Sequence, residues 1–240
     1  MRVRGGERSQ RLRLAPLVRD ILGAYRRHWR LLVPLALLVL LPQSLADAFL
    51  DGLEIERVSS ASDVAKLASI PLLAAVNLAG EALYAGIVTA AVLHWRRGER
   101  LPGVRPVARE IPVARLIALD LILAITVGIG FALLVIPGLV IYAYLAISPA
   151  LIELRKLGLA DAIAASARLV HGNFLRVLGL ILAVFVVTDA ATTILESPLH
   201  GVGGELALNV VVDATLEPFQ GLATAMLALA LIDLHPDRVA

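Results

Sequence analysis

Apolar residues occur in six long stretches along the chain, separated by shorter polar segments. The stretches lie near residues 31–50, 70–93, 114–135, 139–154, 174–195 and 207–234. A helix needs about 17 to 25 mostly apolar residues to cross the hydrocarbon core of a bilayer. The pattern therefore predicts an all-α, polytopic transmembrane bundle of six spans arranged as three hairpins.

The boundary between the third and fourth stretches is the least distinct. Residues 121–152 are almost continuously apolar, and one helix of that length would extend roughly 48 Å, which is too long for one ordinary crossing. Pro137 and Gly138 lie within this run, and a Pro-Gly pair favours a tight turn. We therefore expect two spans joined by a turn at this pair.

The basic residues indicate the orientation, because cytoplasmic loops carry an excess of Lys and Arg. With six spans, 20 of the 22 basic residues fall on one side, all except Arg57 and Lys66. Merging the third and fourth spans would leave a weaker asymmetry. We therefore expect both termini in the cytoplasm, with a basic tail over residues 1–13, one membrane domain over 14–235 and a short tail over 236–240.

The composition agrees with a membrane protein and excludes several kinds of site. The chain of 240 residues is 59% hydrophobic and 18% charged, with a mean hydropathy of +0.83. Soluble domains are closer to half apolar and a quarter charged. The chain has no cysteine, which excludes disulfides and thiolate metal sites.

A basic segment precedes each outward-going span, and two of these segments predict interfacial amphipathic helices on the cytoplasmic side. In the first, apolar residues recur at helical spacing at Leu14, Leu17, Val18, Ile21, Leu22 and Tyr25. The second has a weaker stripe at Leu159, Ile163, Ala167 and Val170. The middle segment, residues 101–112, contains Pro102, Pro106 and Pro112 and is predicted to be an irregular elbow.

The first basic segment allows two interpretations. Its arginines could bind anionic lipid headgroups, or they could only orient the protein in the membrane. The candidate lipid contacts are Arg19, Arg26, Arg27 and Arg30.

Acidic and amide side chains inside the predicted spans form the candidate site. An acid within a span costs about 2.5 to 3.5 kcal/mol on insertion scales, so each one needs a reason. Two polar stripes stand out, one around Glu81 in the second span and one ending at Glu217 in the sixth. The candidate intramembrane site comprises Asn77, Glu81, Asp189, Asn209, Asp213 and Glu217.

These polar residues again allow two interpretations. They could handle protons or cations in a wet cavity, or they could be neutral, hydrogen-bonded groups that specify helix packing. Asp120 lies near a span end, where we expect it to reach water or Arg115.

No catalytic signature occurs in the chain, and no cofactor is implied. The sequence has no Walker loop, no Gly-x-Ser-x-Gly and no zincin motif. The histidines fall in different segments without metal-binding spacing, so we expect no metal site. The basic tail adjoins the first span, which favours a membrane surface over nucleic acid as its partner.

Residues 136–180 and 24–38 carry a family resemblance. The shared features are Pro137-Gly138, Pro149, Ser166 and the sequence Gly172-Asn173-Phe174, together with the opening AYRRHWRLLVPLALL. The chain resembles the membrane-domain family of glycerophosphoryl diester phosphodiesterases and related uncharacterised six-helix bacterial membrane proteins. The resemblance implies a multi-pass protein of the bacterial cytoplasmic membrane, without the separate catalytic domain.

The leading interpretation is a non-enzymatic membrane protein with a structural, lipid-interacting or assembly role. The alternative is a small transporter or channel for protons, cations or a small solute, which would use the intramembrane acids. The expected partners are membrane lipids, including anionic ones, and either other copies of the chain or other membrane proteins.

Overall fold

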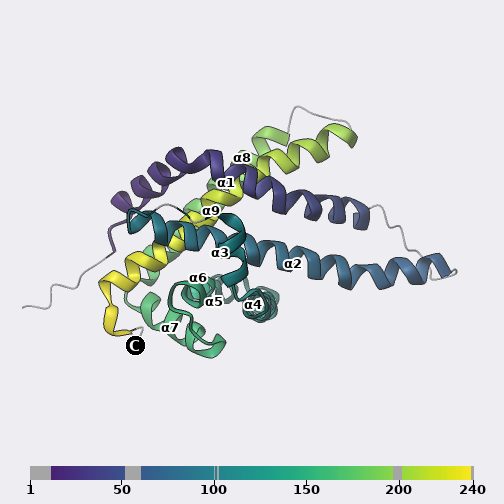
Figure 1. Ribbon diagram of the computed structural model, residues 1–240. Coiled ribbons are helices and arrows are strands. Elements are labelled where there is room, and N and C mark those ends of the chain that lie inside the picture. Colours follow the sequence, from purple (N-terminus) through teal and green to yellow (C-terminus); the bar gives the residue numbers. More distant parts are fainter. Residues whose placement is uncertain (1–11, 52–60, 100, 102, 197–201, 239–240) are drawn as a thin grey trace, which may run out of the picture.

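A computed structural model describes residues 12–51, 61–99, 101, 103–196 and 202–238 (Figure 1). These residues are helical apart from short connections and include no strand. The helices are α1 (Leu14–Asp51), α2 (Ala61–Arg96), α3 (Val104–Glu110), α4 (Val113–Leu133), α5 (Val135–Leu145), α6 (Ser148–Arg155), α7 (Leu159–His171), α8 (Phe174–Glu196), α9 (Val202–Leu234) and the 3-10 turn η1 (Pro236–Arg238).

Each of the six predicted apolar stretches falls within this helical framework. In the described part, three segments are long and apolar enough to cross a membrane: Val113–Gly130, Ile136–Arg155 and Ala214–Leu234. A fourth is obtained if α7 and α8, which meet at an angle of 103°, count as one broken span. The all-helical class and three to four candidate spans are therefore established.

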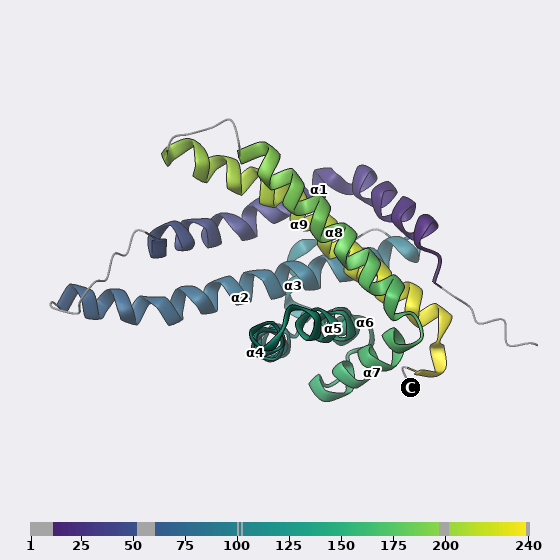
Figure 2. The ribbon, with the colours of Figure 1, turned by 180° about the vertical axis from the view of Figure 1, so that it is seen from behind.

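Helices α8 and α9 run side by side, and α1 packs against both α2 and α9 (Figures 1 and 2). α2 is central to the molecule, because it also contacts α3, α4 and α6. Small residues allow the close approach of α2 and α9: a Cβ at Gly221 would lie 3.3 Å from Cγ1 of Val88. Such contacts are the usual means of packing helices in lipid, where burial of apolar surface gives no driving force.

The segment predicted to be an irregular elbow is partly helical, so that prediction is wrong. α3 forms two turns over Val104–Glu110. Pro106 is its third residue, where a missing N–H removes no helical hydrogen bond because the first-turn donors have no partner within the helix. Val107 and Ile111 are buried and hold this segment against the bundle.

The break between the third and fourth apolar stretches lies at Leu134 rather than at Pro137-Gly138. Leu134 is extended, with φ −168° and ψ 147°, while Pro137 and Gly138 lie in the first turns of α5. Pro137 is accepted there for the same reason as Pro106. α4 and α5 then pack against each other with very close backbones, since a Cβ at Gly130 would lie 2.8 Å from Cα of Gly138.

The two predicted amphipathic segments are packed against protein. Leu17 and Ile21 of α1 are buried, whereas Leu22 is exposed, and α1 continues without interruption into the first apolar stretch. In α7 the buried face consists of Ala162, Ala165, Ser166, Leu169 and Val170. Of the predicted stripe, Val170 is buried, and Leu159 and Ile163 are partly buried and pack against the core.

One end of the molecule, which we call the basic end, collects the start of α1, the ends of α2 and α9, and the α7–α8 junction. Arg96 of α2 forms an ion pair with Asp233 of α9 at 2.6 Å. His28 of α1 stacks on Trp95 of α2, with ring centroids 3.7 Å apart. Segments predicted to share one side of the membrane therefore meet in the fold.

Candidate functional site

An acidic cavity lies where α2, α4, α5, α6 and α9 come together. Its volume is about 400 Å³, and a smaller hollow of about 180 Å³ adjoins it through shared walls. Both are lined by Glu81 of α2, Asp120 of α4 and Glu217 of α9. Three carboxyl groups from distant parts of the sequence thus face one space.

Further polar groups extend this cavity along the same helices. Thr89 of α2, Tyr142 of α5, and Gln220 and Thr224 of α9 line the larger space. No lysine, arginine or histidine is among the described lining residues. The lining therefore combines negative charge with neutral hydrogen-bonding groups, and it offers no cationic group to an anion.

The carboxyl groups act on one another electrostatically. Glu81, Asp120 and Glu217 line the same space, and so does Tyr142. Like charges held in a region of low dielectric repel strongly, so a proton or a bound cation lowers the free energy of the cluster. This arrangement favours the binding of positive charge.

Tyr84 provides a second polar feature that is independent of the acids. Its side chain is 3% exposed and lines the smaller hollow. Its hydroxyl is buried and has no hydrogen-bond partner among the described residues. A buried hydroxyl left unsatisfied costs about 1 to 3 kcal/mol, so a ligand that hydrogen-bonds to Tyr84 would recover that free energy.

Local features of α9 position Glu217. Pro218 follows it inside the helix and cannot donate to the carbonyl four residues earlier. Nearby, the hydroxyl of Tyr25 in α1 donates to the carbonyl oxygen of Thr215 at 3.0 Å. Tyr25 thereby ties α1 to the segment of α9 that carries the acid.

A second, mostly apolar groove adjoins the cavity and lies between α4, α5, α8 and α9. This groove has a volume of about 570 Å³ and includes Val127, Leu180, Val184, Phe185 and Ala223 in its lining. Tyr142, Ala146, Gln220 and Thr224 line both spaces. A polar and an apolar compartment therefore share one wall.

The predicted site residues are only partly described. Glu81 and Glu217, expected from two separate polar stripes, line the same cavity. The side chains of Asn77, Asp189, Asn209 and Asp213 lie outside the described part of the structure, although the helices that carry them are described. Their role stays a prediction.

Sequence reasoning missed Asp120 as a member of this site. Among the described residues Asp120 forms no ion pair with Arg115, and it lines the cavity instead. A signal was available, because Leu116, Asp120 and Leu123 share a helical face by spacing and all three line the cavity.

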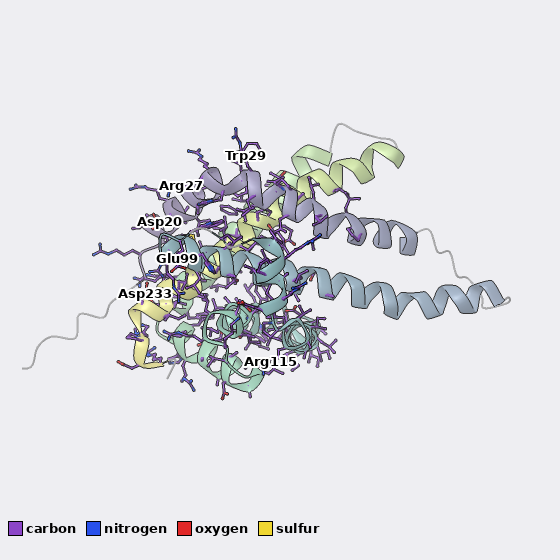
Figure 3. All side chains as sticks on the ribbon, in the orientation of Figure 1. Asp20, Arg27, Trp29, Glu99, Arg115 and Asp233 are labelled. Atoms are coloured by element: carbon purple, nitrogen blue, oxygen red, sulfur yellow. The ribbon has the colours of Figure 1, made fainter. Side chains whose placement is uncertain are left out.

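The four arginines proposed as lipid contacts, Arg19, Arg26, Arg27 and Arg30, are all exposed on α1. The guanidinium of Arg30 lies 5.7 Å from the ring centre of Trp29. Figure 3 shows Arg27 and Trp29 on the outer surface of this helix. The described residues include no group of three or more His, Asp or Glu side chains arranged to coordinate a metal ion.

Comparisons with known proteins give a family but no activity. The family model of DUF7847, a domain of unknown function, matches residues 104–233, more than half of the chain. A UPF0259 membrane protein of Pectobacterium carotovorum subsp. carotovorum (strain PC1) is 28% identical over 159 residues. That match covers 66% of this chain and 61% of the relative, which is less than two thirds of its length. No solved structure matches the chain.

These matches support the broader part of the resemblance drawn from the sequence, a relation to uncharacterised bacterial membrane proteins. Neither matching name refers to glycerophosphoryl diester phosphodiesterases or to an enzyme.

Proposed function

The chain belongs to the DUF7847 family, whose function is unknown, and we propose that it is a non-enzymatic integral membrane protein. In this proposal it binds a cation in its acidic cavity and moves the cation across the membrane. The observation that carries the proposal is the convergence of Glu81, Asp120 and Glu217 on one cavity without a described basic residue in its lining. Such acids are costly in a membrane and commonly mark ion pathways.

The depth of the cavity supports this proposal. Glu81 precedes Trp95, at the basic end of α2, by 14 residues, which is about 21 Å along a helix. The hydrocarbon core of a bilayer is about 30 Å thick. With the basic end at the cytoplasmic surface, Glu81 lies well inside the membrane.

The wider setting of the proposal follows from the charge pattern. We place the protein in the bacterial cytoplasmic membrane, with six spans, residues 14–235 as one membrane domain and both termini in the cytoplasm. The ion pair between Arg96 and Asp233 supports this, since it joins two helix ends predicted to be cytoplasmic. A relation to the membrane domains of glycerophosphoryl diester phosphodiesterases stays a prediction.

Charge movement in proteoliposomes tests the proposal. Solid-supported membrane electrometry would apply concentration jumps of protons, K⁺ and tetramethylammonium to the full-length protein. We expect a transient current with at least one of these cations, and we expect Glu217→Gln and Glu81→Gln to abolish it by removing the negative charge. The matched control is Glu99→Gln, since Glu99 is exposed and lies outside the cavity.

The absence of a current from the parent protein with all three cations would overturn the proposal. A current that survives unchanged in Glu217→Gln would do the same.

A second role, contact with anionic lipid, is favoured by the exposed arginines of α1. We propose that Arg19, Arg26 and Arg27, with Arg30 beside Trp29, face the headgroup layer. Phosphatidylglycerol should then raise the unfolding temperature of the detergent-solubilised protein more than phosphatidylcholine does. Replacing Arg19, Arg26 and Arg27 by Gln should remove that difference, and a difference that persists would exclude this contact.

A further inference from the structure

The apolar groove beside the acidic cavity bears on the chemistry of the ligand. Its wall is formed mainly by aliphatic and aromatic side chains, among them Leu180, Val184 and Phe185. Its volume of about 570 Å³ lies within the range of pockets that hold small organic molecules. An inorganic ion or a proton gains no binding free energy from such an apolar surface.

The groove and the cavity meet at four shared residues. Tyr142 of α5, Ala146 just after α5, and Gln220 and Thr224 of α9 line both spaces. Three of these four side chains have a polar group, so the junction lies between the acids and the hydrocarbon surface. Because the two spaces adjoin at these residues, a molecule with one cationic end and one apolar end matches the chemistry of both.

The acidic cavity selects the charged end of that molecule. Glu81, Asp120 and Glu217 attract an ammonium group, and Tyr84 has a buried hydroxyl with no partner among the described residues. Tyr142 also lines this cavity, and a tyrosine ring attracts a cation placed over its face. A headgroup with a carboxylate or phosphate and no ammonium would be repelled by the same acids, which disfavours fatty acids and anionic phospholipids as the ligand.

The outer wall of the groove indicates how the apolar end of the ligand, its tail, enters. Phe185 is 65% exposed and Leu182 is 38% exposed, and both belong to α8, which lies on the outside of the bundle beside α9 (Figure 2). In a bilayer these side chains face lipid. The tail of a ligand can therefore pass from the lipid phase into the groove along α8.

We propose that the cation bound by this protein is an amphipathic amine or quaternary ammonium compound, whose charged head lies among Glu81, Asp120 and Glu217 and whose hydrocarbon tail lies in the groove lined by Val184 and Phe185. This inference rests on the proposed function, because it specifies the class of cation taken by the same cavity.

Ligand-induced stabilisation of the full-length protein tests the inference. The protein is kept in dodecyl maltoside, a detergent with an uncharged head and a C12 tail. A C12 tail without a cation is therefore present in every sample and serves as the control for the tail alone. The probes are tetramethylammonium, which is a head without a tail, and dodecyltrimethylammonium, which has both. Apparent Kd values follow from the rise in unfolding temperature with ligand concentration.

We expect dodecyltrimethylammonium to bind at least about tenfold more tightly than tetramethylammonium, because its tail leaves water or detergent for the groove. Val184→Phe fills the groove and should weaken binding of the tailed probe alone, again by about tenfold. The matched control, Val186→Phe, adds the same ring to the same helix at a residue that is 61% exposed and outside the groove, and it should change neither affinity.

The outcomes separate the inference from the proposed function. Equal affinities for the two probes, with no effect of Val184→Phe, overturn the amphipathic ligand but leave cation binding in place. If neither probe binds, the amphipathic ligand is overturned, and the currents with protons and K⁺ decide the proposed function. If Glu217→Gln binds both probes as well as the parent does, binding of these cations by the acids is itself wrong. If Val184→Phe does not fold, a chain-length series on the parent decides: affinity that fails to rise with tail length overturns the inference.

Discussion

Asn173 is the residue that joins the most distant parts of the chain at the basic end. Its Oδ1 accepts a hydrogen bond from the backbone N–H of Leu12 at 3.1 Å and lies 3.4 Å from a guanidinium nitrogen of Arg176. Its Nδ2 lies 3.4 Å from Nε2 of His235. A buried amide with three partners fixes the start of α8 against both ends of the membrane domain.

His235 makes this junction sensitive to pH. Burial, and then the nearby charge of Arg238, lower the pKa of His235 below its usual value of 6.5. The folded protein therefore favours the neutral ring. The contribution of His235 to stability is present above pH 6.5 and is lost as the pH falls through its pKa in the folded state.

We expect the unfolding temperature of the detergent-solubilised protein to fall between pH 7 and pH 5, and to fall less steeply in His235→Gln. The variant keeps a polar side chain beside Asn173 but has no ring to protonate. Differential scanning fluorimetry across this range measures the two slopes. Identical slopes, or a parent that gains stability on acidification, would contradict the assignment to His235.

At the scale of elements, the crossing of α4 and α5 depends on two glycines. Gly130 and Gly138 bring the two backbones so close that a Cβ on Gly130 would meet Cα of Gly138 at 2.8 Å. A backbone atom cannot move aside as a flexible side chain can. The hairpin therefore requires glycine at residue 130.

We expect Gly130→Ala to destabilise the protein by about 1 to 3 kcal/mol, as other additions to a packed contact do. Gly128→Ala is the matched control, because it lies on the same helix with nothing within 4 Å of the added carbon. That change should be neutral or stabilising by up to about 1 kcal/mol, since Ala favours a helix over Gly. Thermal unfolding of the two variants in detergent measures the difference, and equal unfolding temperatures would contradict the close crossing.

The hydropathy pattern predicted the helices, but it did not predict where the helices break. Long apolar runs have few alternatives to a helix, and each predicted stretch lies within the helical framework. The breaks predicted at Pro106 and Pro137 were wrong, because a proline is accepted in the first turn of a helix as readily as outside a helix. Pro149 likewise lies in the first turn of its helix, just after the break between α5 and α6.

At the scale of the whole molecule, the acidic cavity depends on how distant helices cross. The periodicity of α2 and α9 indicated that Glu81 and Glu217 lie on polar faces, because such a stripe follows from helical spacing alone. That these faces meet, and that Asp120 of α4 joins them, depends on tertiary packing. Sequence position suggested that Asp120 was interfacial, since it lies only seven residues after the start of α4. It lines the same cavity as Glu81 because α4 packs against α2.

The central claim, that this cavity attracts cations, is tested most directly by the charge selectivity of thiol labelling. The natural chain has no cysteine, so one introduced thiol gives the only signal. Thr224→Cys places it in the cavity, and Thr188→Cys serves as the matched control on α8, at a residue outside the lining. The measurement is the ratio of labelling rates for a trimethylammonium methanethiosulfonate and its sulfonate analogue.

We predict that this ratio is at least about fivefold higher for Thr224→Cys than for Thr188→Cys, because the three carboxylates concentrate cations and repel anions. Adding Glu217→Gln should lower the ratio toward that of the control. A cavity cysteine that labels with the same ratio as the control, or that does not react at all, would contradict the account.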